Sequence, residues 1–219
     1  MNKLKSSYVS IVNRIVALFV PSLEFLLIGW SKKLERGKWT KIHPPYEIVD
    51  VKVGAYTYIS KNSKISSCEI GKFCSIGPNF FAGWGIHPTN GISTSPMFYS
   101  NRKQNGITLS SSNKILERKK IVIGNDVFIG MNVTILDGVK IGDGAIIGAN
   151  SLVSKDIPPF FLAAGSPCKL IRKRFEDDII KELQKIRWWD WKEDRLKQVE
   201  QNFFDVKSFI NQQNENQSK

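Results

Sequence analysis

The sequence contains few residues that bind metal ions or form disulfides. Its 219 residues include only two histidines, His43 and His87, so a three-histidine metal site cannot form within one chain. The cysteines Cys68, Cys74 and Cys168 are odd in number and contain no Cys-x-x-Cys pair, which argues against a disulfide framework or a zinc ribbon. This composition predicts a cytoplasmic protein in a reducing compartment.

Acidic residues are also scarce relative to basic ones. The chain has 32 Lys+Arg against 20 Asp+Glu, a net charge of +12. Such a surplus indicates an anionic partner, which could be nucleic acid, a phosphate-bearing cofactor, an acidic glycan or a membrane surface, unless the lysines only solvate exposed faces. The positive charge is spread over several segments and no nucleic-acid motif occurs, so we expect no nucleic-acid partner.

No long apolar run is free of charge. The most apolar segment, residues 7–30, contains Arg14 and Glu24 and is divided by a proline. A charge at the bilayer centre costs about 2.5 kcal/mol or more, and no small-residue cleavage site follows. We therefore expect residues 1–48 to be an apolar, basic helical segment. It either packs on the body of the protein or, through residues 1–40, lies on the inner face of the membrane.

A six-residue repeat dominates the middle of the chain. From residue 123 an aliphatic residue recurs at every sixth position, usually followed by glycine: Ile123, Ile129, Ile135, Ile141, Ile147 and Val153. An α-helix cannot hold this period on one face, and an alternating strand has period two. Six residues fit one short strand and one tight turn that glycine permits. Three such units close a triangular coil, and the coils stack by parallel pairing.

The same period occurs earlier and is then interrupted. Val53, Ile59 and Ile65 are six apart, and one five-residue step leads to Ile70. We expect a β-helical domain over residues 49–174, wound in two blocks at about 51–80 and 121–158. Residues 81–120 break the period and are rich in Gly, Pro, Ser, Thr and Asn, which predicts a protruding loop. Long loops in compact domains are usually functional.

The C-terminal segment, residues 175–219, has a helical pattern. Apolar residues recur at helical spacing from Phe175 to Ile186, with acidic residues near the start, where the helix dipole favours them. A second helix is expected between Leu196 and Ile210. The polar end, residues 211–219, predicts a disordered tail.

Three motifs together resemble the hexapeptide-repeat acyltransferases, in the xenobiotic and sugar O-acetyltransferase branch. They are the stretch from Ile123 to Phe175, His87 followed by Thr94-Ser95-Pro96-Met97-Phe98, and the sequence Trp188-Trp189-Asp190-Trp191. The likeness spans about residues 51–191. It implies a single-stranded left-handed parallel β-helix, acetyl-CoA as co-substrate, and a homotrimer with active sites between adjacent subunits.

The resemblance also assigns roles to residues. It makes His87 the general base that deprotonates an attacking hydroxyl, since imidazole titrates near neutrality. The attack is direct, so Cys68 and Cys74 are interpreted as small buried residues rather than nucleophiles. Similarity to the galactoside and maltose acetyltransferases places acetyl-CoA against Phe128, Met131, Ala149, Ser154, Lys155, Lys169 and Arg172. The turn residues would act through backbone groups and the cations on CoA phosphates.

One of these positions departs from the family. Phe128 stands where the family often has tryptophan, and it keeps an apolar wall but lacks the indole N–H donor. The sequence predicts an O-acetyltransferase for a sugar, such as a bacterial surface polysaccharide or its precursor. Acetylation of an antibiotic, as by the chloramphenicol and streptogramin members of the branch, is one alternative. A non-catalytic β-helical scaffold is another.

Overall fold

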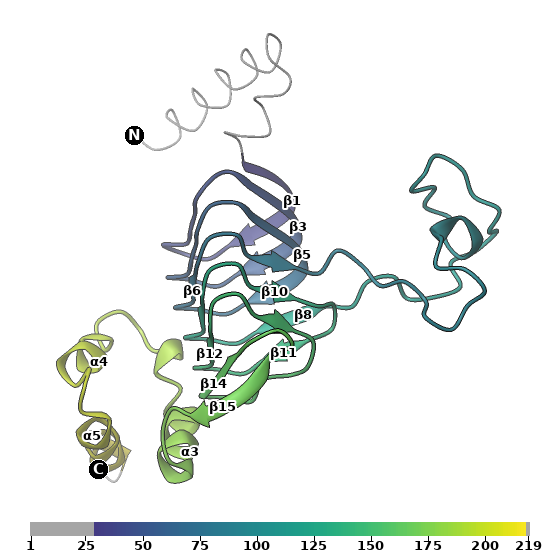
Figure 1. The fold of residues 1–219 in the computed structure, drawn as a ribbon. Coiled ribbons are helices and arrows are strands. Elements are labelled where there is room, and N and C mark those ends of the chain that lie inside the picture. Colours follow the sequence, from purple (N-terminus) through teal and green to yellow (C-terminus); the bar gives the residue numbers. More distant parts are fainter. Residues whose placement is uncertain (1–28, 218–219) are drawn as a thin grey trace, which may run out of the picture.

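The computed structural model describes residues 29–217, and its body is a parallel β-helix with three faces (Figure 1). The first face pairs, in order, β1 (Gly29–Arg36), β3 (Tyr46–Val53), β5 (Ser63–Ile70), β7 (Phe81–Ala82), β10 (Thr134–Ile135) and β13 (Leu152–Val153). The second face consists of the C-terminal halves of β1, β3 and β5, then β8 (Ile121–Ile123) and β11 (Lys140–Ile141).

The third face pairs β2 (Lys41–Ile42), β4 (Tyr58–Ile59), β6 (Ser75–Ile76), β9 (Phe128–Ile129), β12 (Ile146–Ile147) and β14 (Phe161–Ala164). The strand β15 (Lys169–Lys173) turns back on β14 as an antiparallel edge. The predicted mainly β fold, a parallel β-helix of hexapeptide repeats, is confirmed.

The aliphatic residues of the repeat point into the coil and form its core. Ile59, Ile76, Ile129 and Ile147 follow one another down the third face and are fully buried. Each buried side chain of this size contributes about 1.5–3 kcal/mol relative to exposure. Cys68 and Cys74 are buried in the same core, as predicted.

The five-residue step in the repeat marks a tight corner between the first and second faces. The strand β5 continues through this corner, and Ser67 takes a left-handed backbone conformation there, with φ 50°. Asp50 does the same in β3, with φ 56°. As a result Ile48 pairs with Ile65, seventeen positions on, whereas Ile129 pairs with Ile147, eighteen positions on.

The coil begins further towards the N-terminus than the predicted boundary at residue 49. Residues 29–48, expected to be helical, form β1, β2 and the start of β3 instead. The repeat is hard to see in β1 because, within residues 29–217, this strand pairs only with β3, and most of its side chains are exposed. The remainder of the predicted apolar, basic helical segment, residues 1–28, lies outside the described residues.

The C-terminal segment is helical, as expected, but its end differs from the prediction. It contains α3 (Asp177–Ile186), the 3₁₀ turn η2 (Trp188–Asp190), α4 (Lys197–Gln201) and α5 (Val206–Gln217). The single helix expected between Leu196 and Ile210 is therefore two helices. The prediction of a disordered tail from residue 211 was wrong, since α5 runs to Gln217. Phe209, Ile210 and Gln213 of this helix are buried, and Gln213 accepts a hydrogen bond from Arg195 at 2.7 Å.

Residues 174–193, the C-terminal strap, run back along the corner between the second and third faces. Their apolar side chains join a second core cluster around Trp189 and Phe160. The Trp188 ring lies 5.0 Å from that of Phe73, which stacks on Tyr56 at 4.7 Å. The strap thus touches several successive coils. No helix among residues 29–217 is both long and apolar enough to cross a membrane.

Candidate functional site

A long loop leaves the coil at the corner between the first and second faces. It starts after Ala82 at the end of β7 and returns at Ile121 in β8, close to the predicted limits of 81 and 120. In Figure 1 it projects well away from the coil and carries the short 3₁₀ helix η1 (Pro96–Phe98). The predicted base, His87, therefore lies outside the stacked coils.

One carboxylate of the coil forms hydrogen bonds to both ends of this loop. Asp137, at the corner after β10, accepts hydrogen bonds from the backbone N–H groups of Gly85 at 3.0 Å and Lys119 at 3.1 Å. Next to it, Arg118 donates to Ser66 Oγ at 3.2 Å and lies 5.7 Å from the centre of the Trp84 ring. The loop base is thus fixed to the coil just before His87.

The His87 side chain is exposed, and its contacts fall on one ring nitrogen. Nδ1 lies 2.9 Å from the Thr94 carbonyl oxygen and 2.9 Å from Tyr99 Oη. A carbonyl oxygen can only accept, so this contact requires a proton on Nδ1. The neutral ring then carries its free lone pair on Nε2, the nitrogen that can accept a proton.

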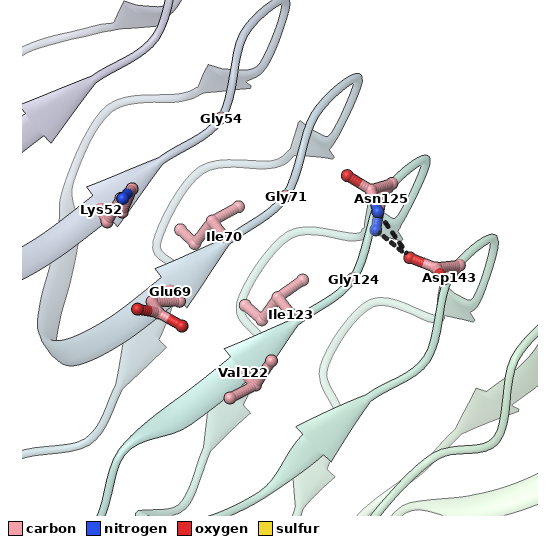
Figure 2. A pocket seen from close by; sticks show the side chains of 10 residues that line it. All are labelled: Lys52, Gly54, Glu69, Ile70, Gly71, Val122, Ile123, Gly124, Asn125 and Asp143. Atoms are coloured by element: carbon pink, nitrogen blue, oxygen red, sulfur yellow. Dashed lines mark hydrogen bonds between the residues drawn. The ribbon is translucent and has the colours of Figure 1, made fainter. Parts of the chain in front are cut away.

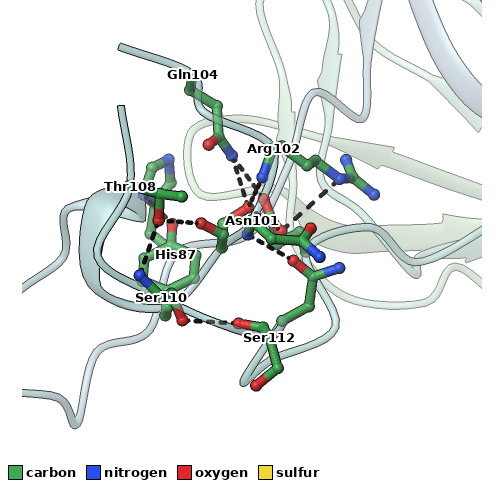
Figure 3. A network of polar contacts seen from close by, with 11 residues as sticks. His87, Asn101, Arg102, Gln104, Thr108, Ser110 and Ser112 are labelled. Atoms are coloured by element: carbon green, nitrogen blue, oxygen red, sulfur yellow. Dashed lines mark hydrogen bonds and ion pairs between the residues drawn. The ribbon is translucent and has the colours of Figure 1, made fainter. Parts of the chain in front are cut away.

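The interior of the loop is polar rather than apolar (Figure 3). Glu117, only 9% exposed, accepts hydrogen bonds from Ser100 Oγ at 2.7 Å and Gln104 Nε2 at 2.8 Å. Thr108 donates to the carbonyls of Met97 and Ser100 at 3.0 and 2.7 Å. These bonds give the loop a fixed shape although it has no strand of its own.

Four of the residues expected to hold acetyl-CoA lie in two pairs on either side of the first face. Met131 and Ala149 are exposed at the corner between the third and first faces, where the Asn150 N–H donates to the Met131 carbonyl at 2.9 Å. Ser154 and Lys155 are exposed at the opposite corner, immediately after β13, in the coil next to Asp137.

The remaining expected residues belong to the third face. Phe128, 46% exposed, belongs to an outward-facing row and is followed in paired register by Ile146, Leu162 and Arg172. Lys169 is paired with Ala164 at the start of β15 and is also exposed. An apolar row on this face therefore ends in cationic side chains.

Sequence reasoning missed several residues that shape the loop, namely Tyr99, Asp137 and Glu117. Tyr99 directly follows the motif Thr94–Phe98, so proximity to that motif was a usable signal. Nothing in the repeat marks Asp137, because its role depends on which loop leaves the neighbouring coil.

A shallow depression of about 420 Å³ lies elsewhere, at the corner between the second and third faces (Figure 2). The stacked glycines Gly54, Gly71 and Gly124 line it, next to Asn125, whose backbone and side chain both donate to Asp143. It includes none of the residues predicted for the site.

The β-helix of six-residue repeats and the histidine on its protruding loop are features of the hexapeptide-repeat transferases. The family model described as bacterial transferase hexapeptide (six repeats) matches residues 120–155. A chloramphenicol acetyltransferase from Agrobacterium fabrum is 43% identical over 143 residues, which cover 64% of this chain and 68% of that protein. The chain thus belongs to the hexapeptide-repeat acetyltransferases and is an acyltransferase.

Solved structures agree with this family. A hexapeptide-repeat acetyltransferase from Vibrio cholerae O1 biovar eltor, in complex with acetyl coenzyme A, matches with a TM-score of 0.50 and 26% identity, covering 72% of this chain and 76% of that one. A maltose O-acetyltransferase from Clostridium difficile matches with a TM-score of 0.51 and 28% identity, covering 65% and 70%.

Proposed function

We propose that this protein transfers an acetyl group from acetyl-CoA to a hydroxyl of a sugar, with His87 as the general base. The observation that carries the proposal is the contact of 2.9 Å between His87 Nδ1 and the Thr94 carbonyl, which leaves Nε2 as the proton acceptor on an exposed ring. General base catalysis of this kind contributes about 10²- to 10⁴-fold to a rate.

The proposed reaction has no covalent enzyme intermediate. Nε2 takes the hydroxyl proton while the hydroxyl oxygen attacks the thioester carbonyl carbon. When the C–S bond breaks, the imidazolium returns the proton to the departing thiolate. The buried cysteines suit no nucleophilic role, since burial raises the pKa of the Cys74 thiol to about 12 and also raises that of Cys68.

The third face has the chemistry that acetyl-CoA would need. The row from Phe128 through Ile146 and Leu162 offers an apolar wall to the pantetheine arm. Arg172 and Lys169 at its end could pair with the phosphates, because guanidinium and ammonium groups bind phosphate oxygens strongly. Met131, Ala149, Ser154 and Lys155 would contribute at the corners beside this row.

A homotrimer would bring His87 of one subunit close to the expected acetyl-CoA residues of its neighbour. Within one chain, His87 stands at one corner of the first face and Met131 and Ala149 at the other. In the proposed assembly, the loop of one subunit faces the third-face row of its neighbour. The active site is then shared between adjacent subunits.

For the acceptor, we propose a bacterial surface polysaccharide or its precursor. The polar interior of the loop and the net charge of +12 favour a hydroxyl-rich, anionic partner close to the inner membrane face. The second candidate acceptor is an antibiotic, which the 43% identity to a chloramphenicol acetyltransferase favours. A non-catalytic scaffold would have no use for the fixed tautomer of His87.

The test is acetyl transfer by the purified full chain and by His87→Gln, measured as thiol release from acetyl-CoA across sugars, nucleotide-sugars and chloramphenicol. We expect transfer to a sugar hydroxyl and a loss of about 10²- to 10⁴-fold in His87→Gln. His43→Gln is the control, since His43 lies near the start of the coil, outside the loop. A fully active, correctly assembled His87→Gln protein would refute the mechanism, and transfer to chloramphenicol alone would overturn the sugar assignment.

A further inference from the structure

Tyr99 is a buried aromatic residue in a loop whose other side chains are largely exposed. Its exposed fraction is 5%, and its ring meets the His87 ring edge-on, with centroids 6.2 Å apart and planes at 88°. Its hydroxyl oxygen lies 2.9 Å from His87 Nδ1. Burial, and then the charge of Glu117, raise the pKa of Tyr99, so the phenol stays neutral near pH 7.

The backbone of Tyr99 is held from two sides. Its N–H donates to the Pro96 carbonyl at 3.2 Å within η1, and its carbonyl accepts the Lys114 N–H at 2.8 Å from the returning arm of the loop. The phenol is thus carried on an ordered segment rather than on a free tip.

Glu117 connects the neighbours of His87 and Tyr99. Its backbone carbonyl accepts the N–H of Ile86, the residue before His87, at 2.9 Å. Its carboxylate accepts the hydroxyl of Ser100, the residue after Tyr99, at 2.7 Å. One residue therefore holds both segments, and the separation of the two rings depends on it.

We propose that Tyr99 is a positioning residue for His87, acting together with the Thr94 carbonyl. The single proton on Nδ1 is shared between the Thr94 oxygen and Tyr99 Oη, both at 2.9 Å. The Thr94 carbonyl, before η1, fixes the tautomer because it can only accept. The Tyr99 hydroxyl, directly after η1, fixes the rotation of the imidazole, and the two contacts together direct Nε2 outward. Glu117 holds the neighbours of His87 and Tyr99 and so sets the distance between the two rings. This inference rests on the proposed function of His87.

The variant Tyr99→Phe removes the hydroxyl and keeps the buried ring. We expect kcat to fall about 10- to 100-fold, because small misplacements of a catalytic group cost this much, while the KM for acetyl-CoA is unchanged. Tyr46→Phe is the matched control, since it removes a phenol hydroxyl from strand β3, outside the loop. Glu117→Gln keeps the size of the side chain and removes its charge, and we expect a smaller loss of kcat in the same direction.

A direct readout is the ¹⁵N spectrum of histidine, which separates the two ring tautomers and is simple here because the chain has two histidines. We expect His87 to populate the Nδ1–H form in the unchanged protein. In Tyr99→Phe the imidazole can rotate away from the Thr94 carbonyl, and we expect a mixture of the two tautomers. Unaltered kcat and an unaltered His87 spectrum in Tyr99→Phe would overturn the inference. If His87→Gln is also fully active, the proposed function itself fails. If His87→Gln is inactive, only the role of Tyr99 is lost.

Discussion

Asp137 holds Gly85 to the coil through a hydrogen bond of 3.0 Å from the Gly85 backbone N–H to the Asp137 carboxylate. The other oxygen of the same carboxylate accepts the Lys119 N–H at 3.1 Å. The departing and returning arms of the loop are therefore joined at one rigid corner of the β-helix. Because Gly85 is two residues from His87, this corner fixes where the loop delivers the histidine.

Removing this carboxylate should uncouple the loop from the coil. We expect Asp137→Ala to retain the β-helix, since the coil core is untouched, but to lose at least about tenfold in kcat because His87 is misplaced. Cleavage within residues 83–120 by limited proteolysis should become faster. The control is Asp156→Ala, whose carboxylate caps the Lys140 N–H at 2.8 Å at the same corner of the next coil, away from the loop. Equal behaviour of the two variants would contradict the prediction.

Arg172 should act in binding rather than in the chemical step. We expect Arg172→Ala to raise the KM for acetyl-CoA several-fold at low salt and to leave kcat nearly unchanged, because a phosphate contact is made equally before and during the reaction. The difference should shrink as ionic strength rises. Lys140→Ala, on β11 of the second face, is the charge-matched control. A fall in kcat at constant KM would argue against phosphate binding at Arg172.

A methyl group at Gly144 should destabilise the coil beneath the strap. A Cβ there would lie 2.5 Å from ring carbons of the buried Phe160, at a backbone φ of 67°. Gly144→Ala should lower the free energy of unfolding by roughly 1–3 kcal/mol more than Gly106→Ala. Gly106 also has a positive φ, 93°, but no atom lies within 4 Å of its added Cβ. Urea unfolding of both variants measures the difference, and equal losses would show that Phe160 moves aside freely.

The strap should loosen in acid. Burial raises the pKa of Asp190, but hydrogen bonds from Lys72 and Arg187 outweigh it, so that the pKa is lowered below 3.8. The bonds from Lys38 and Tyr56 lower the pKa of Glu193 below 4.5. A lowered carboxylate pKa stabilises the folded strap above the ordinary pKa, and this stabilisation disappears as pH falls through the folded pKa.

Tryptophan fluorescence can follow this change, since Trp188 packs on Phe73 at 5.0 Å. Between about pH 5 and about pH 2 we expect the part of the strap around Asp190 and Glu193 to loosen progressively, while the apolar cluster around Trp189 keeps the strap on the coil. The double variant Asp190→Asn, Glu193→Gln should show the loosened signal already at neutral pH and lose most of the transition. Glu176→Gln, whose side chain makes no capping bond to α3, should titrate like the unchanged protein.

The repeat carried enough information to predict the body of the fold. One aliphatic residue in six is sufficient because each coil buries the same inward position, as Ile129 and Ile147 show. The six-residue pattern is weaker where a coil does not bury this inward position. Among the described residues β1 pairs only with β3, and it exposes most of its residues, so the sequence pattern did not show that it belongs to the coil. The helix α5 was not predicted from its polar sequence because it is stabilised by contacts to residues outside the helix, such as Arg195, which a local pattern does not record.

By itself, the sequence determined the β-helix and the position of the loop, because local periodicity encodes both, and a short motif predicted His87 as the general base. Only the tertiary structure decided which atom of His87 is held, that Asp137 anchors both arms of the loop, and that Phe128 and Arg172 share one row. These relationships join residues as far apart as Gly85 and Asp137, 52 positions in sequence, and they arise from the stacking of coils. The physical reason is that register between coils is set by backbone pairing, which no local pattern of side chains records.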